Sequence, residues 1–319
     1  MANEYFSEFV NGRFGYFYDV HERIHAEHTG FQHLEVRRSG ELGRVMLLDG
    51  ITQVAERNDW LYHEPMVHPA LCAHPDPRRV CIVGAGDGGI AREVLRHGPE
   101  RVVQCELDRR VVEVCREHLP TIGAGAFDDP RVELAIGDGR RFIETTDERF
   151  DTVIMDMTDP FGPSALLYTQ EMFAAVKTAL CDEHGLFVMH CESPIARPTA
   201  FQQILRTLAT VWPHQAVFYV YIQMYGVLWA IVVSGQSDAV ATLPEATIAT
   251  RLAARGIDGL QVYSPQTHRA MQVAYPFVTR LRDEAEQVAV ITDTAHRFAD
   301  EDQLEGLPQA PPVARKQQP

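Results

Sequence analysis

The sequence has no long uninterrupted run of apolar residues and little positive charge. A membrane helix requires roughly 18 to 20 consecutive apolar residues, which no stretch approaches. The start, MANEYFSEFVNGRFG, also lacks the basic-then-apolar order of a signal peptide. The 29 Lys and Arg residues are outnumbered by 44 Asp and Glu, giving a formal net charge of −15, whereas nucleic acid binding needs clustered positive charge. We therefore expect a cytoplasmic protein with no membrane or nucleic acid partner and a neutral or cationic ligand.

The cysteines are not arranged in pairs. The chain has six of them, none in a CxxC motif, and most lie in apolar runs such as VCIVG and VVQCEL. This pattern favours buried free thiols over disulfides or a zinc site, so we expect no bound metal. The cysteines are Cys72, Cys81, Cys105, Cys115, Cys181 and Cys191.

The length and the turn pattern indicate how the chain is divided. A chain of 319 residues that is 45% hydrophobic suits one large or two smaller globular domains. Its first sixty or so residues contain short alternating stretches, FQHLEVRRS, GRVMLLDG and ITQVAER, which predict a small antiparallel β domain over residues 1–66. At the other end the proline-rich, polar tail GLPQAPPVARKQQP predicts disorder over residues 301–319.

Between these segments, residues 67–300 alternate strand-like and helix-like runs. They read RVCIVGAG then GIAREVLRHG, RVVQCEL then DRRVVEVCREHL, RVELAIGDG then RRFIET, and FDTVIMD then TQEMFAAVKTAL. This order predicts a parallel sheet with helices on both faces. The later runs QAVFYVYIQ and VLWAIVVSG are too close together for a crossover helix, so they predict an antiparallel hairpin. By analogy, the layout is the α/β, Rossmann-like sheet of S-adenosylmethionine-dependent transferases, with a small N-terminal antiparallel β domain.

A glycine loop follows the first strand of this sheet. Gly84, Gly86 and Gly89 form GxGxxG, and Glu106 ends the next strand, where a carboxylate can accept hydrogen bonds from both ribose hydroxyls. The pair predicts a nucleoside site. The alternative is that the glycines only make tight turns and that Glu106 caps a helix. A dinucleotide is disfavoured because Asp87 lies in the loop, where its charge would repel phosphate and attract an ammonium group.

Two further acidic motifs follow later strands. Asp138 and Gly139 follow the next strand, where they could contact an adenine. In isolation an Asp-Gly turn before a helix is the default interpretation, but their position at the carboxyl end of a strand favours a ligand. Asp156 and Asp159 follow the fourth strand, and carboxylates this close must pair with cations or share protons. If Asp87 joins them, the site is an acidic pocket beside a nucleoside. Such a pocket suits a polyamine.

In this order and at this spacing, GAGDGG, CELD, GDGRRF and DMTDPFGP resemble the motifs of the polyamine aminopropyltransferases, the spermidine synthase family. The resemblance extends from about Tyr5 to about Arg282 and includes FQHLEV, GRVMLLDG, AERNDWLYHE and YSPQTHRA. It implies a homodimer or homotetramer. It also implies that decarboxylated S-adenosylmethionine is the aminopropyl donor, a co-substrate used without a further cofactor.

The resemblance also implies where the donor binds. Gln32 and Glu106 would hold its methylthioribose part, while Asp138 and Gly139 would face the adenine. Asp87 would bind the ammonium of the aminopropyl arm, which decarboxylation leaves without a neighbouring carboxylate. The implied donor-binding residues are Gln32, Gly84, Gly86, Asp87, Glu106, Asp138, Gly139 and Pro163.

The acceptor side follows in the same way. Asp156 would be the general base, because an aliphatic amine is almost wholly protonated at neutral pH and needs deprotonation before it attacks. Tyr62, His63, Asp87 and Asp159 would position the acceptor. Tyr225 could pack on its methylene chain, although a structural role in the strand pair is equally plausible for it. Without the resemblance, the favoured interpretation of Tyr62 and His63 is that they are core or interface residues, and His63 could be no more than a surface histidine ion-paired with Glu64.

Some positions depart from the family pattern. Ala85 replaces the middle glycine of GGGDGG, and its methyl group fits if the backbone angles there are ordinary. The segment YIQMYGVLWAIV replaces one that usually lines the acceptor channel. This departure leaves the acceptor open: putrescine is expected as the commonest acceptor of the family, with spermidine, agmatine or a related polyamine as the alternative.

The alternatives to an aminopropyltransferase are three other classes of protein. A small-amine methyltransferase would need a cation for the donor carboxylate, and Arg92 is the one near the loop. A nicotinamide-dependent dehydrogenase is disfavoured by Asp87 and by the final hairpin. A non-catalytic polyamine-binding homologue would be expected to lack Asp87 or Asp156, and both are present.

Overall fold

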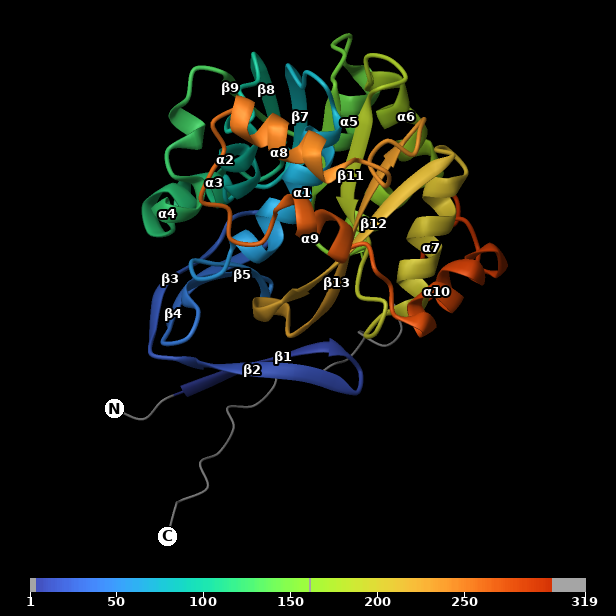
Figure 1. Ribbon diagram of the computed structural model, residues 1–319. Helices are drawn as coiled ribbons and strands as arrows, with labels where there is room; N and C mark the ends of the chain where they lie inside the picture. Colours follow the sequence, from blue (N-terminus) through green and yellow to red (C-terminus); the bar gives the residue numbers. More distant parts are fainter. Residues whose placement is uncertain (1–3, 161, 300–319) are drawn as a thin grey trace.

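The computed structural model describes residues 4–160 and 162–299 (Figure 1). Its N-terminal part forms two antiparallel sheets, a two-stranded hairpin and a four-stranded sheet in chain order. The predicted antiparallel β unit is confirmed, and three strands, β1 to β3, precede those that the sequence pattern indicated. The strands are β1 (Glu4–Asn11), β2 (Phe14–Val20), β3 (Glu22–His28), β4 (His33–Ser39), β5 (Gly43–Leu48) and β6 (Ile51–Ala55).

A seven-stranded sheet forms the centre of the rest of the molecule, in the order β12-β13-β11-β10-β7-β8-β9. β7 to β11 run parallel, while β13 runs antiparallel to both of its neighbours. The predicted hairpin and fold class are confirmed, and the reversed strand lies inside the sheet rather than at its edge. The strands are β7 (Arg79–Gly84), β8 (Arg101–Glu106), β9 (Val132–Ile136), β10 (Thr152–Asp156), β11 (Leu186–His190), β12 (His214–Ile222) and β13 (Val227–Gly235).

Helices cover both faces of this sheet (Figure 1). α3 and α6 begin where their sequence predicts, because Asp108 and Thr169 accept hydrogen bonds from backbone amides of the first turn. None of the helices in the described ranges is long and apolar enough to cross a membrane. The α-helices are α1 (Trp60–Ala73), α2 (Gly89–Leu95), α3 (Arg109–His118), α4 (Pro120–Gly123), α5 (Gly139–Thr145), α6 (Gln170–Ala179), α7 (Pro198–Ala209), α8 (Glu245–Ala254), α9 (Pro265–Ala270) and α10 (Pro276–Asp283). Short 3₁₀ helices are η1 (Ala126–Asp128), η2 (Gly162–Tyr168), η3 (Gln223–Tyr225) and η4 (Ala285–Gln287).

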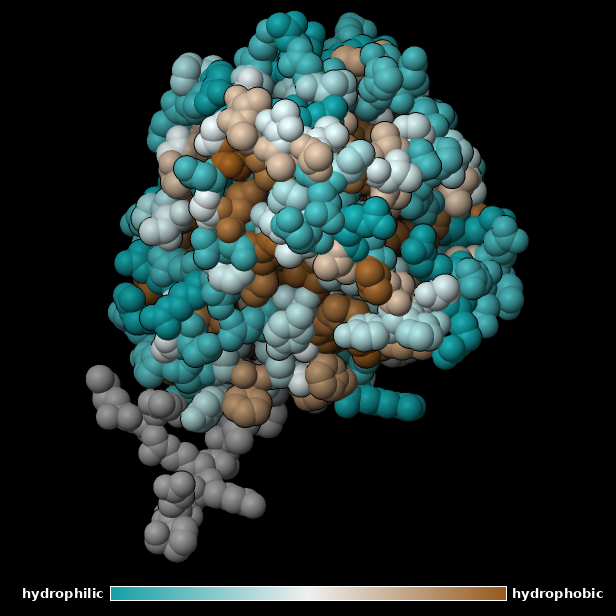
Figure 2. All heavy atoms as spheres, viewed as in Figure 1, coloured by the Kyte–Doolittle hydropathy of each residue, from teal (hydrophilic) through white to brown (hydrophobic). Residues whose placement is uncertain are grey.

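Three apolar clusters form the core. One lies on the α1, α2 and α8 side of the large sheet and extends to Val10 and Tyr18 of the N-terminal hairpin. A second lies on the opposite face, under α6 and α7. The third joins β4, β5 and β6 to α3. Figure 2 shows hydrophobic residues across the middle of the viewed face, between helices α8 and α9 and the hairpin. The N-terminal strands are therefore packed against the large sheet rather than held by a linker alone.

Helix α1 connects the two parts of the chain and is buried along almost its whole length. The predicted domain boundary between residues 66 and 67 falls inside this helix, so the division into 1–66 and 67–300 stays a prediction. The predicted disordered segment 301–319 lies outside the described residues. Glu64 of α1 is 2% exposed, and its carboxylate accepts backbone hydrogen bonds from Gln261, Val262 and Tyr263 at 2.7 to 2.8 Å. This carboxylate fixes the segment after α8 against the core.

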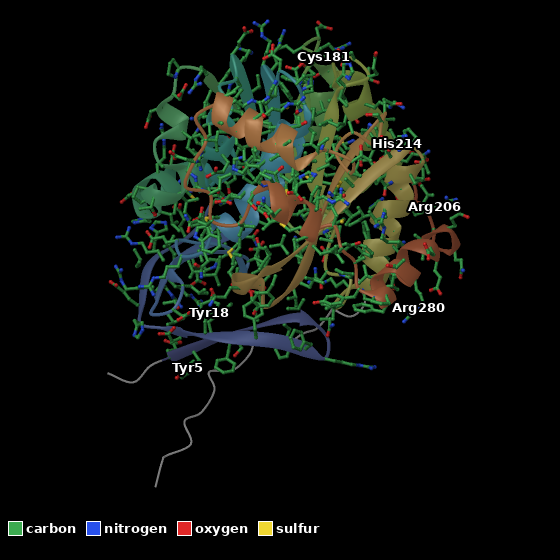
Figure 3. The ribbon with its side chains drawn as sticks, in the orientation of Figure 1. Tyr5, Tyr18, Cys181, Arg206, His214 and Arg280 are labelled. Carbon is green, nitrogen blue, oxygen red and sulfur yellow. The ribbon has the colours of Figure 1, made fainter. Side chains whose placement is uncertain are left out.

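The cysteines are free, as predicted, but one of them is not buried. Cys72, Cys81, Cys105, Cys115 and Cys191 are inside the fold, whereas Cys181 is exposed. Cys181 follows α6 in the turn before β11, at the end of the molecule opposite to Tyr5 in the hairpin (Figure 3). The apolar run that precedes it ends with the helix, so the expectation of a buried thiol is wrong at this position.

We expect Glu64→Gln to destabilise the fold, because an amide cannot accept hydrogen bonds at both ends and would turn its NH₂ group toward a buried backbone N–H. An unsatisfied buried donor costs about 1 to 3 kcal/mol. Equilibrium denaturation should therefore show a loss of about 2 kcal/mol in the free energy of unfolding. The matched control is Glu183→Gln, an exposed glutamate before β11, for which we expect a change within about 0.5 kcal/mol. Equal effects for the two variants would contradict this account of Glu64.

Candidate active site

The carboxyl ends of three neighbouring parallel strands form the base of the site. Gly84 ends β7, Glu106 ends β8 and Asp156 ends β10. β7 pairs with both of the others, and Asp156 lies opposite Gly84 in the register. Because parallel strands bring their carboxyl ends to one edge, residues that are far apart in sequence meet there. The sequence prediction that this edge carries the site is consistent with the arrangement.

The glycine loop approaches the end of β10 very closely. Gly84 has φ of +86°, and a Cβ atom there would lie 2.0 Å from the backbone oxygen of Asp156. The amide of the next residue, Ala85, donates to that same oxygen at 2.9 Å. Ala85 itself has φ of +59°, in the left-handed region that side chains disfavour. The condition on which its methyl group was expected to fit, ordinary backbone angles, is therefore not met. At Gly86 an added Cβ would lie 2.7 Å from a methyl carbon of Val111.

Asp87 lies in this loop beside a buried histidine. Its Oδ1 accepts from the amide of Gly89 at 2.6 Å and lies 3.5 Å from Nε2 of His63. The other ring nitrogen of His63 lies 2.9 Å from Asp59. Burial opposes a charged ring, but the two carboxylates outweigh it and raise the pKa of His63 to about 10. In the same way the imidazolium and the Gly89 amide, acting against burial, hold the pKa of Asp87 below its ordinary value.

This geometry corrects the ion-pair alternative for His63. The ring pairs with Asp59 and Asp87, while Glu64 is used by the backbone after α8. His63 is 1% exposed and lies directly behind Asp87, where it orients that carboxylate. The nearby cation Arg92 is also engaged, because its guanidinium lies 2.9 Å from Asp59 and 2.8 Å from Glu93.

Among the residues that the structure describes, Asp156 forms a side-chain hydrogen bond but no salt bridge. Tyr62 donates its hydroxyl hydrogen to Oδ1 of Asp156 at 2.6 Å. Burial, together with the negative charge of Asp87, raises the pKa of Asp156 to about 7. The ring of Tyr62 packs edge-on against Tyr225, 6.0 Å between centroids, and Tyr225 packs against Trp229 at 5.2 Å. The structure thus brings Tyr62, Asp156 and Tyr225 together, and their roles toward a substrate stay predictions.

Glu106 and Gln32 meet through a residue that the sequence analysis missed. The amide of Asp108 donates to Oε1 of Glu106 at 2.8 Å, and Gln32 donates to the Asp108 carboxylate at 3.1 Å. Asp108 also caps α3, so the alternative that Glu106 is the helix cap is wrong. Burial and the charges of Asp108, Asp156 and Asp87 raise the pKa of Glu106 to about 7. An Asp directly before an amphipathic helix is an N-cap signal, which would have identified Asp108.

The remaining residue expected on the donor side, Asp138, is a helix cap in this structure. Its carboxylate accepts from the amides of Arg140 and Arg141 at the start of α5. The Asp-Gly turn alternative therefore describes these contacts, and a role toward adenine stays a prediction. A Cβ at Gly139 would lie 2.5 Å from a methyl carbon of Val83. Pro163 is in η2, and its side chain lies outside the described part of the chain.

Asp159 is paired with Arg197, a residue that no sequence motif indicates. One terminal guanidinium nitrogen of Arg197 lies 2.6 Å from Oδ2 of Asp159 and 3.1 Å from Oε2 of Glu192. The requirement that two close carboxylates pair with cations or share protons is thus met differently at the two positions. Asp159 has a cation beside it, whereas Asp156 has a raised pKa.

A fourth element contributes a carboxylate from the N-terminal hairpin. Glu8 of β1 accepts from the amide of Thr52 at 2.8 Å. Burial raises the pKa of Glu8 to about 7, and the charge of Asp159 contributes to the shift. Burial raises the pKa of Tyr225 well above its ordinary value, and the charges of Asp156, Asp159, Asp87 and Glu8 add to the shift. Sequence analysis missed Glu8 because it lies in an isolated strand without a motif.

Five carboxylates contribute to the site, and two of them, Asp87 and Asp159, have a cation beside them. Buried carboxylates with raised pKa values gain most from a cationic ligand. Within the described ranges 4–160 and 162–299, no group of three or more His, Cys, Asp or Glu residues has an arrangement that could hold a metal ion. The five carboxylates of the site are those of Glu106, Asp87, Asp156, Asp159 and Glu8.

The fold and the site define an α/β enzyme of the Rossmann-like transferase class. A model of the spermine/spermidine synthase domain matches residues 59–244, and one of the spermidine synthase tetramerisation domain matches residues 5–56. The chain is 38% identical over 285 residues to a polyamine aminopropyltransferase of Nitrosomonas europaea, covering 89% of this chain and 87% of the relative. The chain therefore belongs to the spermine/spermidine synthase family, and the resemblance seen in the sequence is confirmed.

Solved structures agree with this assignment. A crystal structure of spermidine synthase in complex with the transition-state analogue AdoDATO has a TM-score of 0.81 and 30% identity, covering 88% of this chain and 94% of that one. Spermidine synthase from Thermotoga maritima gives a TM-score of 0.80 at 30% identity, with the same coverage.

We expect Tyr62→Phe to raise the pKa of Asp156 further above its ordinary value. The hydroxyl donates a hydrogen bond to the carboxylate and thereby stabilises its charged form, so removing it favours the protonated form. The carboxyl carbon of Asp156, assigned with Asp156→Asn, can be titrated by ¹³C NMR in protein labelled at aspartate. Tyr263→Phe is the matched control, because that buried tyrosine bonds to His268 instead. An unchanged or lowered pKa of Asp156 in Tyr62→Phe would contradict the prediction.

Proposed function

We propose that the protein transfers the aminopropyl group of decarboxylated S-adenosylmethionine to an amine acceptor. The observation that carries this proposal is the position of Asp156, a buried carboxyl with a pKa near 7 that faces the charge of Asp87. A base with this pKa is half ionised near neutral pH and can accept a proton from an ammonium group. Membership of the family and the names of its relatives support the same reaction.

The proposed donor-binding roles follow from the charge and the position of each side chain. Glu106 would accept hydrogen bonds from the ribose hydroxyls through its second oxygen, and Gln32 would contact the same part of the donor. Asp87, held in place by His63 and Gly89, would bind the ammonium of the aminopropyl arm. Intact S-adenosylmethionine carries a carboxylate that Asp87 would repel. Arg92 is engaged with Asp59 and Glu93, which disfavours the methyltransferase alternative.

The transfer requires the removal of one proton from the acceptor amine. Asp156 would take a proton from the acceptor ammonium, and the freed lone pair would attack the carbon next to the sulfonium. As the new C–N bond forms, the C–S bond breaks and its electrons return to sulfur, so the leaving group is neutral methylthioadenosine. The sulfonium charge already activates that carbon, so the proposed reaction uses the donor as a co-substrate and involves no resident cofactor.

At the acceptor side, the ring of Tyr225 and the carboxylates of Glu8 and Asp159 would hold the far end of the amine. Putrescine is the proposed acceptor, with spermidine, agmatine or a related amine as the alternative. The far ammonium of a diamine would lower the free energy of the buried Glu8 carboxylate, whose pKa is raised to about 7. His63 would act on the acceptor through Asp87.

The family match to a tetramerisation domain supports a homo-oligomer, and we propose a homodimer or homotetramer. The hairpin that this domain includes exposes large aromatic side chains, with Phe14 49% and Phe17 66% exposed, and such patches mark interaction surfaces. The cytoplasm is the proposed location. Six cysteines that form no disulfide are consistent with a reducing compartment.

The proposal is tested by a product assay with decarboxylated S-adenosylmethionine and, in separate reactions, putrescine, cadaverine, agmatine, spermidine and norspermidine. Methylthioadenosine release and the mass of the amine product are followed. We expect stoichiometric formation of both products, with putrescine preferred. Activity with none of the amines, but methyl transfer from intact S-adenosylmethionine, would contradict the proposed function and support the methyltransferase alternative.

We expect Asp156→Asn to retain donor affinity and to lose turnover by about 100-fold or more, the usual effect of removing a general base. Calorimetric titration with donor and rapid-quench turnover with putrescine separate the two quantities. Asp151→Asn is the control, because Asp151 lies at the amino end of the same strand and bonds to the amides of Arg78 and Arg79. Turnover close to that of the wild type in Asp156→Asn would exclude the base role.

A further inference from the structure

Arg197 brings a buried positive charge to the acceptor end of the site. It precedes α7 and is 6% exposed. Its terminal nitrogen Nη1 contacts both Asp159 and Glu192, and its Nε donates to the backbone oxygen of Val10 in β1 at 2.9 Å. The adjacent Asn11 side chain donates to the oxygen of Ala196. Arg197 is therefore fixed from both the hairpin and the catalytic sheet, with its charge directed at Asp159.

The charges of Arg197, Asp159 and Glu192 can be counted together. Two carboxylates and one guanidinium give this triad a formal charge of −1. Burial opposes a charged guanidinium, but the two carboxylates outweigh it and raise the pKa of Arg197, so it stays charged. His190 lies near Asp159 and Arg197, and burial lowers its pKa, so it adds no positive charge near neutral pH. Without Arg197 the triad would carry −2.

We propose that Arg197 is a specificity-determining residue that occupies, with its own charge, the place of an additional acceptor ammonium group and thereby restricts the enzyme to diamines. The proposal rests on the proposed aminopropyl transfer to an amine. Putrescine carries one ammonium beyond the reacting nitrogen, and spermidine carries two. Because Asp159 is already paired with Arg197 at 2.6 Å, a second distal ammonium finds less uncompensated negative charge and also meets the repulsion of the guanidinium.

The alternative explanation is that Arg197 only holds the hairpin to α7. A purely structural role would change stability or overall activity, but it would not change the preference between amines of different charge in a way that follows the charge of the triad. The ratio of kcat/KM for spermidine to kcat/KM for putrescine separates the two roles, because losses common to both acceptors cancel in it.

The test is a cycle of four full-length proteins. The triad carries −1 in the wild type, −2 in Arg197→Gln, 0 in Asp159→Asn and −1 in the double variant Asp159→Asn/Arg197→Gln. We expect the spermidine-to-putrescine ratio to rise about 10-fold or more in Arg197→Gln and to fall in Asp159→Asn. The double variant should return to within about threefold of the wild type, since its triad has the same charge.

If Arg197→Gln does not fold, the comparison between Asp159→Asn and the double variant still tests the proposal. These two proteins differ only at residue 197, in a background where Asp159 is not left as an unpaired carboxylate, and the ratio should be about 10-fold higher in the double variant. Thermal unfolding of each protein accompanies the assay. Ratios that do not follow the triad charge, or a wild type that already prefers spermidine, would overturn the proposal. A wild type that transfers no aminopropyl group to any amine would instead refute the proposed function.

Discussion

Repulsion between carboxylates buried at the carboxyl edge of the parallel sheet is the constraint on which the rest of the site depends. Strand geometry places Glu106 and Asp156 at this edge, and the glycine loop adds Asp87 between them. Burial makes their charged forms unfavourable, and the negative charge of each carboxylate makes the charged forms of the others more unfavourable still. The three carboxylates differ in how their charge is compensated. His63 lowers the pKa of Asp87, whereas the pKa values of Asp156 and Glu106 are raised to about 7. Different pKa values in one pocket are what separates a binding carboxylate from a base.

The lowered pKa of Asp87 depends on a network of hydrogen bonds and ion pairs that extends from His63 along helices α1 and α2. His63 contacts Asp59, Asp59 contacts Arg92, and Arg92 contacts Glu93. Glu93 in turn contacts His68, which is hydrogen-bonded to His97 at 2.8 Å. Each buried group thus has a partner of suitable charge or polarity, which is the condition under which buried polar networks are stable. The position of a single loop carboxylate is in this way fixed by the core of α1 and α2.

The parts of the site that could be predicted from sequence are those with a local signal. Gly84, Glu106 and Asp156 are found because each ends a hydrophobic strand or follows it directly, and a parallel sheet brings such positions together. Asp138 shows the limit of this inference, since its carboxylate caps α5 in the structure. Glu8 and Arg197 carry no such signal. Their contacts join residues far apart in the chain, 187 positions in the case of Arg197 and Val10, and no periodicity or spacing in either segment encodes the other.

The wall of the site next to β13 is formed by η3 (Gln223–Tyr225), and its residues contact the N-terminal part of the chain. Tyr225 donates its hydroxyl hydrogen to the backbone oxygen of Gln53 at 2.9 Å, and Gln223 is hydrogen-bonded to Asn58 and Glu41. Tyr16 of the hairpin packs against Gly226, where an added Cβ would lie 3.0 Å from the ring. A change in the shape of this wall must therefore be matched by changes in the N-terminal strands. Evolution toward a new amine would proceed by coordinated substitution in both segments, and exchanging the N-terminal strands between relatives would exchange part of the substrate preference with them.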